Sequence, residues 1–305
     1  MYLLSMRKPF ILNLIIFVSS GLIFYLVLGQ ILVYCAQSQI KVNLSNEITA
    51  IVIGHSHPEC AIDPSFFPGL ANFGKSGEAL FYGCLKGRKI LQEHPEIKTV
   101  FIELSANQLD AHMEEWVTDE DHFQRAMKSY FFLLPTSLKW TFWRSFPLLY
   151  SQSQLIAEKK MLNVCLMEEA KQNVAEMEWG GFVSHDKVVI DSLRYQKDSP
   201  IMPLHPYRPN LSALLDFIQY CSSHGVEPVL IRTPVHVSEL DIHESSFQDL
   251  VKKNFSHLKF LDFRRFPLQD GSFLDREHLN AEGARIFTVH FCKVWSEAST
   301  HRVMQ

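Results

Sequence analysis

The stretch AIVIGHSH, residues 50–57, contains a short apolar run and then a serine, Ser56. The run is typical of a buried strand, so Ser56 is expected on the turn that leaves the strand, exposed and with its backbone N–H free. Far downstream, Asp275 and His278 form an Asp-x-x-His sequence before the last expected helix. These are the base and the orienting carboxylate that a serine nucleophile needs.

Apolar, β-rich runs alternate with helical patterns from residue 47 onward. The expected strands are 50–53, 71–73, 99–104, 228–231 and 260–263, and the expected helices include 78–94 and about 280–296. This alternation predicts an α/β domain with a parallel sheet over residues 47–305. Because ligands gather at the carboxyl ends of parallel strands, we expect Ser56, Asn107 and the Thr233-Pro234 turn at one edge of the sheet.

The segment 109–203 breaks this alternation, because it is rich in aromatic residues and long helical patterns. We interpret it as a helical insertion between the third and fourth strands, and insertions there usually shape substrate access. Its runs 130–134 and 140–150 look apolar, but charges and prolines interrupt them, so core packing is favoured over a membrane-surface or substrate-stacking face. The sequence WGGF, 179–182, predicts a tight turn, either ordinary structure or one wall of a sugar-sized cleft.

The amino-terminal stretch 10–36 contains no charged residue. A membrane-spanning helix needs about 20 such residues, so we predict a single transmembrane anchor here, preceded by a short tail, 1–9. Arg7 and Lys8 precede the stretch and the next charge is Lys41, so the positive-inside bias places the tail in the cytoplasm and the C-terminal domain outside it. A cleaved signal peptide is the alternative, although the stretch is long for one.

Composition excludes some classes of function. The 29 Lys and Arg residues against 33 Asp and Glu residues give a net charge of −4, so no basic field argues for nucleic acid. The six cysteines show no CxxC pair and no metal-type spacing, and they do not form a disulfide framework. We expect no metal and no organic cofactor.

Four short blocks resemble, in order, those of the SGNH (GDSL-like) hydrolase and acyltransferase superfamily. They are GHSH at 54–57, NFGKSG at 72–77, SANQ at 105–108 and DREH at 275–278. The resemblance spans residues 54–279 and depends on order and context: each of the first three blocks follows an expected strand, and the fourth precedes the terminal helix.

The resemblance implies a flavodoxin-like three-layer sandwich that acts as a serine esterase or O-acyltransferase. It implies Ser56 as nucleophile, His278 as base and Asp275 as the carboxylate that orients the base. The oxyanion hole would consist of the backbone N–H groups of Ser56 and Gly77 and the side-chain amide of Asn107.

The chain departs from the family at His55, because the family usually has an aspartate before the serine. That aspartate would brace the turn. The groups that perform the chemistry are nevertheless all present.

An exported, membrane-tethered member of this family would act on ester-linked acyl groups, such as O-acetyl groups, of an envelope or exported polysaccharide. Its partners would be this acylated carbohydrate or another ester and, through residues 10–36, the lipid bilayer. One alternative is a catalytically silent polysaccharide-binding or scaffold protein. Another is a metal-dependent hydrolase in which His55 and His57, which alternate on an extended chain, share one metal ion. The contiguous Ser-His-Asp at 184–186 cannot form a triad, because adjacent side chains diverge.

Overall fold

The computed structural model describes residues 2–39, 41–145, 147–166, 179–186, 202–239 and 242–303. The chain divides into two compact units, one of residues 1–41 with 127–177 and one of residues 42–126 with 178–305. The second unit contains the sheet and every site residue that the sequence selects.

Five parallel strands form one sheet in the order β2-β1-β3-β4-β5. The strands are β1 Ala50–Gly54, β2 Leu70–Gly74, β3 Thr99–Glu103, β4 Glu227–Arg232 and β5 Lys259–Asp262. All five expected strands are confirmed to within one residue at each end. Ile53 pairs with Phe73 on one side and with Ile102 on the other, so β1, β2 and β3 end at the same edge. This strand order is that of the flavodoxin-like sandwich, and the predicted fold class is confirmed.

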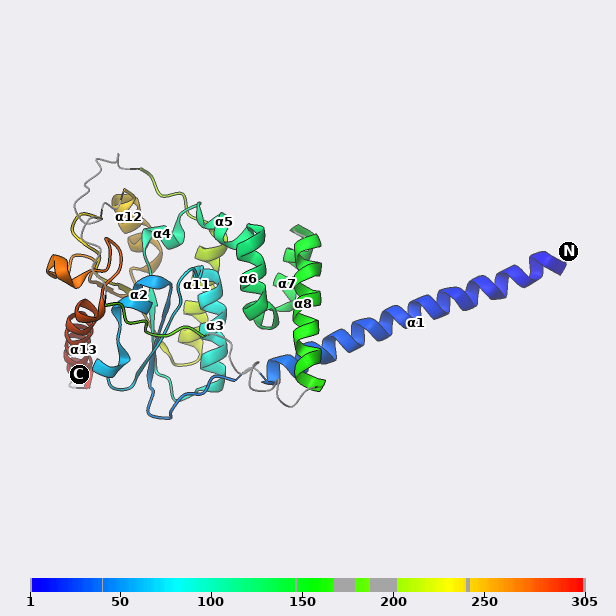
Figure 1. The fold of residues 1–305 in the computed structure, drawn as a ribbon, viewed down its shortest axis with the longest axis horizontal. Helices are drawn as coiled ribbons and strands as arrows, with labels where there is room; N and C mark the ends of the chain where they lie inside the picture. Colours follow the sequence, from blue (N-terminus) through cyan, green and yellow to red (C-terminus); the bar gives the residue numbers. More distant parts are fainter. Residues whose placement is uncertain are drawn as a thin grey trace. The chain divides into compact units, whose positions relative to one another are not determined.

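Helices cover both faces of the sheet (Figure 1). Since successive side chains of a strand point to opposite faces, Ile51 and Ile53 join one core cluster and Ala50 and Val52 join another. The first cluster includes residues of α3 (Leu80–Glu93), α11 (Arg208–Ser223) and α12 (Glu244–Phe255). The second includes residues of α2 (Ser56–Ala61) and α13 (Ala281–Val303). The result is a sandwich of three layers. The cysteines that the structure describes with their side chains, Cys60, Cys84, Cys221 and Cys292, are free thiols.

The described part of the predicted insertion is mostly helical. Its helices are α5 Met113–Thr118, α6 Glu120–Tyr130, α7 Thr136–Ser145 and α8 Pro147–Leu166, with a short 3₁₀ turn at Phe131–Leu133. The short helix α4, Ala106–Leu109, comes just before them, and two further 3₁₀ turns lie outside the insertion at Pro64–Phe66 and Asp270–Ser272. Phe131 and Phe132 are buried, as core packing requires. Core packing is wrong for Trp140 and Trp143, which stack on each other with 62% and 44% of their surfaces exposed.

The segment 179–186 has no regular secondary structure and does not form the predicted tight turn. The N–H of Gly181 donates to the carbonyl of Gly74 at 2.9 Å. Gly180 has φ +91°, and a Cβ there would lie 2.3 Å from the same carbonyl oxygen, so only glycine fits. The segment therefore fastens to the end of β2. Its Ser-His-Asp sequence lines neither of the cavities described below.

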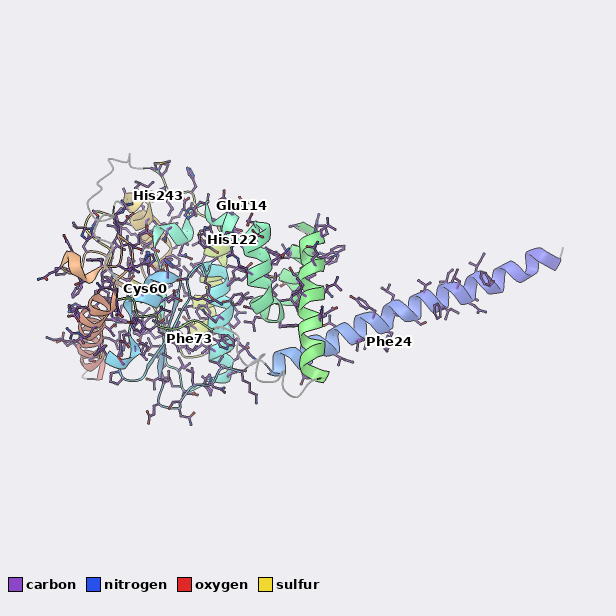
Figure 2. All side chains as sticks on the ribbon, in the orientation of Figure 1. Phe24, Cys60, Phe73, Glu114, His122 and His243 are labelled. Atoms are coloured by element: carbon purple, nitrogen blue, oxygen red, sulfur yellow. The ribbon has the colours of Figure 1, made fainter. Side chains whose placement is uncertain are left out.

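The first helix, α1 (Tyr2–Gln39), contains the apolar stretch Phe10–Ile31, which has a mean hydropathy of 2.5. Within the described residues it is the one helix long and apolar enough to cross a membrane, and none of the stretch is buried. The side chain of Phe24, 69% exposed, projects from it (Figure 2). Such a helix has the length that a bilayer core requires.

Candidate active site

Ser56 is brought next to His278, which lies far away in the sequence. Ser56 is the first residue of α2, directly after β1, and His278 lies on the loop before α13. The Nε2 atom of His278 is 2.8 Å from Ser56 Oγ, and its Nδ1 atom is 2.9 Å from each carboxylate oxygen of Asp275. Serine, imidazole and carboxylate therefore form one continuous chain of hydrogen bonds.

The loop that carries His278 is tied to the start of α13. Asn280 is the residue before this helix; its side-chain oxygen accepts from the N–H of Gly283 at 3.0 Å, as an N-cap does. The Asn280 amide also donates to the carbonyl of Gly271 at 2.6 Å. The N–H of Leu274 donates to the carbonyl of His278 at 2.9 Å. These bonds fold the loop back on itself and fix the position of the imidazole.

The electrostatics of this pair suit a base held by a carboxylate. Burial alone would lower the pKa of His278, but the hydrogen bond and charge of Asp275 outweigh it and raise the pKa above the usual histidine value. Burial would raise the pKa of Asp275, but the bonds from His278 and from backbone N–H groups lower it instead. Asp275 therefore stays ionised at neutral pH and stabilises the imidazolium.

The expected oxyanion residues line one cavity with the catalytic candidates. Ser56, Gly77, Asn107 and His278 are among the residues around a space of about 270 Å³. Ser56 opens a helix, so its N–H has no partner within that helix. Gly77 has φ +72°, a left-handed conformation that favours glycine. Oδ1 of Asn107 accepts a hydrogen bond from Ser105 Oγ at 2.6 Å. The NH₂ group of the same side chain therefore points away from Ser105.

Two buried charged residues, which sequence analysis missed, hold the turn that contains Gly77. Glu59 of α2 accepts from the N–H of Ser76 at 3.1 Å and also from its hydroxyl. Lys86 of α3 pairs with Glu78 at 2.7 Å and donates to a backbone carbonyl of β2, and it is fully buried. Gly77 is thus fixed from both sides. Lys86 lies one turn before buried Ile90, and a charge on an apolar helix face is the signal that could have revealed it.

A second cluster of ionisable groups lies next to Ser56. His55, His57 and Glu103, all buried, offer donor atoms that lie within 4.8 Å of one another. Glu103 ends β3, and its carboxylate is 2.8 Å from His55 Nε2 and 3.7 Å from His57 Nδ1. The set has the chemistry of a metal site, as does the set of His57, Glu277 and His278. Glu103 was not anticipated, although a carboxylate at the end of an apolar strand marks it.

A second cavity of about 350 Å³ adjoins the first. The two share His57, Asn107, His112 and Glu277. The second is also lined by Thr233, on the turn expected at this edge, and by Arg232, Arg264 and Arg276. The shared residues show that the two cavities are neighbours, and the second brings arginine side chains close to the Ser56 cavity. His112, with Met113 and Trp116 of α5 in the first cavity, was not predicted to take part.

Comparison with known proteins finds structural likeness only. No family profile matches the sequence, and no curated protein matches it. One similar solved structure is a candidate acylhydrolase from Bacteroides fragilis, with 10% identity and a TM-score of 0.40 over 86% of this chain and 93% of that chain. Another is a candidate platelet activating factor from Streptococcus pneumonia, with 10% identity and a TM-score of 0.36 over 88% and 94% of the two chains. Likeness at this level assigns neither a family nor an activity.

Proposed function

We propose that this protein is a serine esterase or O-acyltransferase that works through an acyl-Ser56 intermediate. The observation that carries the proposal is the chain from Ser56 Oγ through His278 to Asp275, with contacts of 2.8 and 2.9 Å. Hydrogen bonds of this length and order are what a serine nucleophile needs from its base.

In the first half-reaction, Ser56 Oγ attacks the ester carbonyl carbon while His278 Nε2 takes the hydroxyl proton. A bond forms between Oγ and the carbon, and the carbonyl π electrons move to the oxygen. The tetrahedral intermediate then collapses, the bond to the leaving alkoxide breaks, and His278 returns the proton to that oxygen. Asp275 keeps the imidazole in the tautomer that presents Nε2 to the serine.

In the second half-reaction, water or a sugar hydroxyl attacks the acyl group, and His278 takes its proton. Breakdown of the second intermediate releases the acid or the new ester and returns the proton to Ser56. With water the reaction is hydrolysis, and with a sugar hydroxyl it is acyl transfer.

The negative oxygen of both intermediates would be stabilised by the N–H groups of Ser56 and Gly77 and by the Asn107 amide. Each preorganised donor contributes about 3 to 4 kcal/mol to lowering the barrier. The firm attachment of the Gly77 turn supports this role, because a donor stabilises the transition state best when it needs no reorganisation.

We place the substrate among O-acylated, above all O-acetylated, carbohydrates of an envelope or exported polysaccharide. The cavity that adjoins the Ser56 cavity includes polar and charged residues in its lining, and these suit a sugar, whose hydroxyls need several donors and acceptors. The apolar helix α1, preceded by Arg7 and Lys8, suits an anchor with the C-terminal domain outside the cytoplasm.

The test is labelling of the full-length protein in detergent with a fluorophosphonate, together with hydrolysis of a small acetyl ester. Wild type should react, and Ser56→Ala should lose both labelling and hydrolysis. Ser184→Ala is the matched control, because this serine also precedes a histidine yet lines neither cavity. Labelling that survives Ser56→Ala would overturn the proposal.

The same preparation separates the two alternatives. A silent scaffold would show no labelling of the wild type but would retain polymer binding. A metal-dependent hydrolase would contain stoichiometric metal and would lose hydrolysis on treatment with a chelator.

A further inference from the structure

The helices α7 and α8 expose several large apolar side chains to the solvent. On α7, Trp140 and Trp143 stack with their ring centroids 5.0 Å apart, and both side chains are exposed. On α8, between 40% and 78% of the surface of each of three apolar residues is exposed: Leu148, Leu155 and Ile156. We call these five residues the α7–α8 patch. Large exposed apolar side chains that gather in one place mark a surface that binds protein or lipid.

The spacing along α8 separates a buried face from an exposed one. Tyr150, Ser153 and Ala157 are buried and lie three and four positions apart, so they share one face of the helix. Leu148 and Leu155 are seven positions apart and lie on the opposite face. The exposure of these leucines therefore follows from the way in which α8 packs within its own unit.

The α7–α8 patch belongs to the same compact unit as the apolar helix α1. α8 contacts α1, and a Cβ placed on Gly29 would lie 3.9 Å from Glu158 Oε1. Gly29 is two residues before Ile31, the end of the apolar stretch. If α1 spans a membrane, this contact lies at the level of one membrane surface. The Glu158 carboxylate is hydrogen-bonded there, because it accepts from Gln154 Nε2 at 2.7 Å.

The contact with α1 fixes the level of the exposed side chains of α8. Leu155 and Ile156 lie within one helical turn of Glu158. They are therefore at about the same level as Gly29. A protein partner that covered them would have to enter the headgroup region, whereas lipid is already present there.

The tryptophan pair is attached to the same unit through the turn Phe131–Leu133. This turn contacts α1, and the Phe131 ring lies 5.6 Å from the Tyr150 ring of α8. Lys139 Nζ lies 4.9 Å from the centre of the Phe131 ring. Trp140 follows Lys139 directly, so the tryptophan pair begins one residue from a side chain that packs on this turn.

The chemistry of the patch also suits a membrane surface. Indole combines a large apolar ring with one N–H donor, and tryptophan is enriched where acyl chains meet headgroups. Arg144 and Lys159 lie beside the patch in the sequence and are exposed, so lipid phosphates are available to both cations.

We propose that the α7–α8 patch lies in the lipid–water interface of the leaflet from which α1 emerges. Leu155 and Ile156 contact the acyl chains beside α1, and Trp140 and Trp143 lie at the level of the headgroups. The proposal goes beyond the esterase function and rests on α1 as the membrane anchor. It adds to this single span a pair of helices that rests on the membrane surface.

The experiment measures tryptophan fluorescence of the full-length protein in phosphatidylcholine vesicles, with plain or with brominated acyl chains. Bromine quenches a tryptophan only on contact. The chain has five tryptophans and α1 contains none, so insertion of α1 alone gives no quenching. The wild type should emit less light in brominated than in plain vesicles. Trp140→Phe with Trp143→Phe should abolish most of this bromine-dependent loss.

The matched control is Trp295→Phe. Trp295 packs on Phe101 with ring centroids 4.9 Å apart, in the other compact unit. This variant should keep the full bromine-dependent loss. A wild type without the loss, or a loss that survives the double variant, would overturn the proposal.

A second arm tests α8 by a gain of signal. In the Trp140→Phe, Trp143→Phe background, Leu155→Trp should restore quenching by brominated lipid. Val237→Trp is its control, because Val237 is 73% exposed but belongs to the α/β unit, and it should restore nothing. Restoration by both variants, or by neither, would contradict a lipid contact of α8.

Flotation of the same vesicles separates this proposal from the anchor. The wild type and the double variant should both float, because α1 holds each of them. Floating protein without the expected quenching would overturn the membrane contact of the α7–α8 patch alone, whereas protein that does not float would overturn the anchor as well. Quenching that increases when the protein is diluted in lipid would show that a second copy covers the patch, which also contradicts the proposal.

Discussion

Ser56 shows how one side chain acquires its chemistry from its neighbours. Its oxygen is in contact with His278 at 2.8 Å and with His55 at 3.4 Å. The carboxylate behind His278 is partly exposed, whereas the carboxylate behind His55 is buried. In the proposed mechanism the partly exposed pair of Asp275 and His278 exchanges protons, whereas Glu103 contacts His55 from within the core.

Asp275→Asn tests the first pair. The amide cannot stabilise the imidazolium and favours the wrong tautomer, so kcat should fall by about 10³- to 10⁴-fold. The residual activity should rise at lower pH than in the wild type, because Asp275 raises the pKa of His278 and its loss lets His278 deprotonate earlier. A pH series of kcat measures both effects, with Asp186→Asn as control. An unchanged rising limb would contradict the assignment.

At this scale the sequence identifies the residues that meet in the cavity but not those that hold them. Ser56, Gly77 and Asn107 each follow a strand, so strand prediction alone brings them to one edge. Glu103 contacts His55 from the neighbouring strand, and Lys86 pairs with Glu78 from the following helix. A local sequence pattern does not predict which residues meet in the folded chain, so neither contact could be foreseen. The only sequence signal for each is a charge at a position where the pattern asks for an apolar residue.

At the scale of elements, the turn between β2 and α3 connects the core to the site. Lys86, inside α3, pairs with Glu78, and this pair anchors the residue next to Gly77. Desolvation on burial lowers the pKa of Lys86 below the usual value, with the charge of Glu78 opposing this effect. α3 thus contributes a buried lysine that pairs with Glu78, as well as apolar side chains that pack in the core.

Lys86→Met should destabilise the fold, because it removes one partner of a buried ion pair. The free energy of unfolding should fall by about 3 to 5 kcal/mol, measured by denaturant titration. In the folded fraction kcat should also fall, since the Gly77 N–H loses its anchor. Lys89→Met, which removes a partly exposed pair on the same helix, should cost less than about 1 kcal/mol. Equal losses for both variants would show that the buried pair has no special role.

Prediction of the elements themselves succeeded where burial dictates the pattern. The runs at 50–53 and 99–104 are apolar on both faces because helices cover both sides of the sheet. The prediction that the aromatic run 140–150 packs in a core failed for Trp140 and Trp143, because both side chains are exposed. Aromatic side chains have an affinity for cores and for surfaces alike, and the sequence does not separate the two.

For the whole molecule, the decisive property is the apolar length of α1. Its stretch Phe10–Ile31 exposes apolar side chains on every side, which water disfavours and lipid accepts. We therefore propose that lipid surrounds α1 and that water surrounds the α/β unit.

The anchor is tested in membranes from cells that express the full chain. Wild type should stay in the pellet after alkaline carbonate extraction and keep its intact mass. Ile16→Lys with Ile23→Lys places two charges in the stretch, at about 2.5 to 3.5 kcal/mol each, and should move the protein to the soluble fraction. Ile16→Leu with Ile23→Leu is the control and should stay in the pellet. A wild-type mass that lacks the first 36 or so residues would indicate a cleaved signal peptide instead.

The distance along the chain between Ser56 and His278 has a consequence for biosynthesis. The two residues are 222 positions apart, and β3 must wait for residues 104–226 before β4 can pair with it. A growing polypeptide therefore contains Ser56 long before it contains His278, the base of the proposed mechanism. Under the proposed function, a truncated or unfinished chain is inert, and the esterase switches on only when the C-terminal loop docks. Acquisition of activity would then report completed folding of the α/β unit.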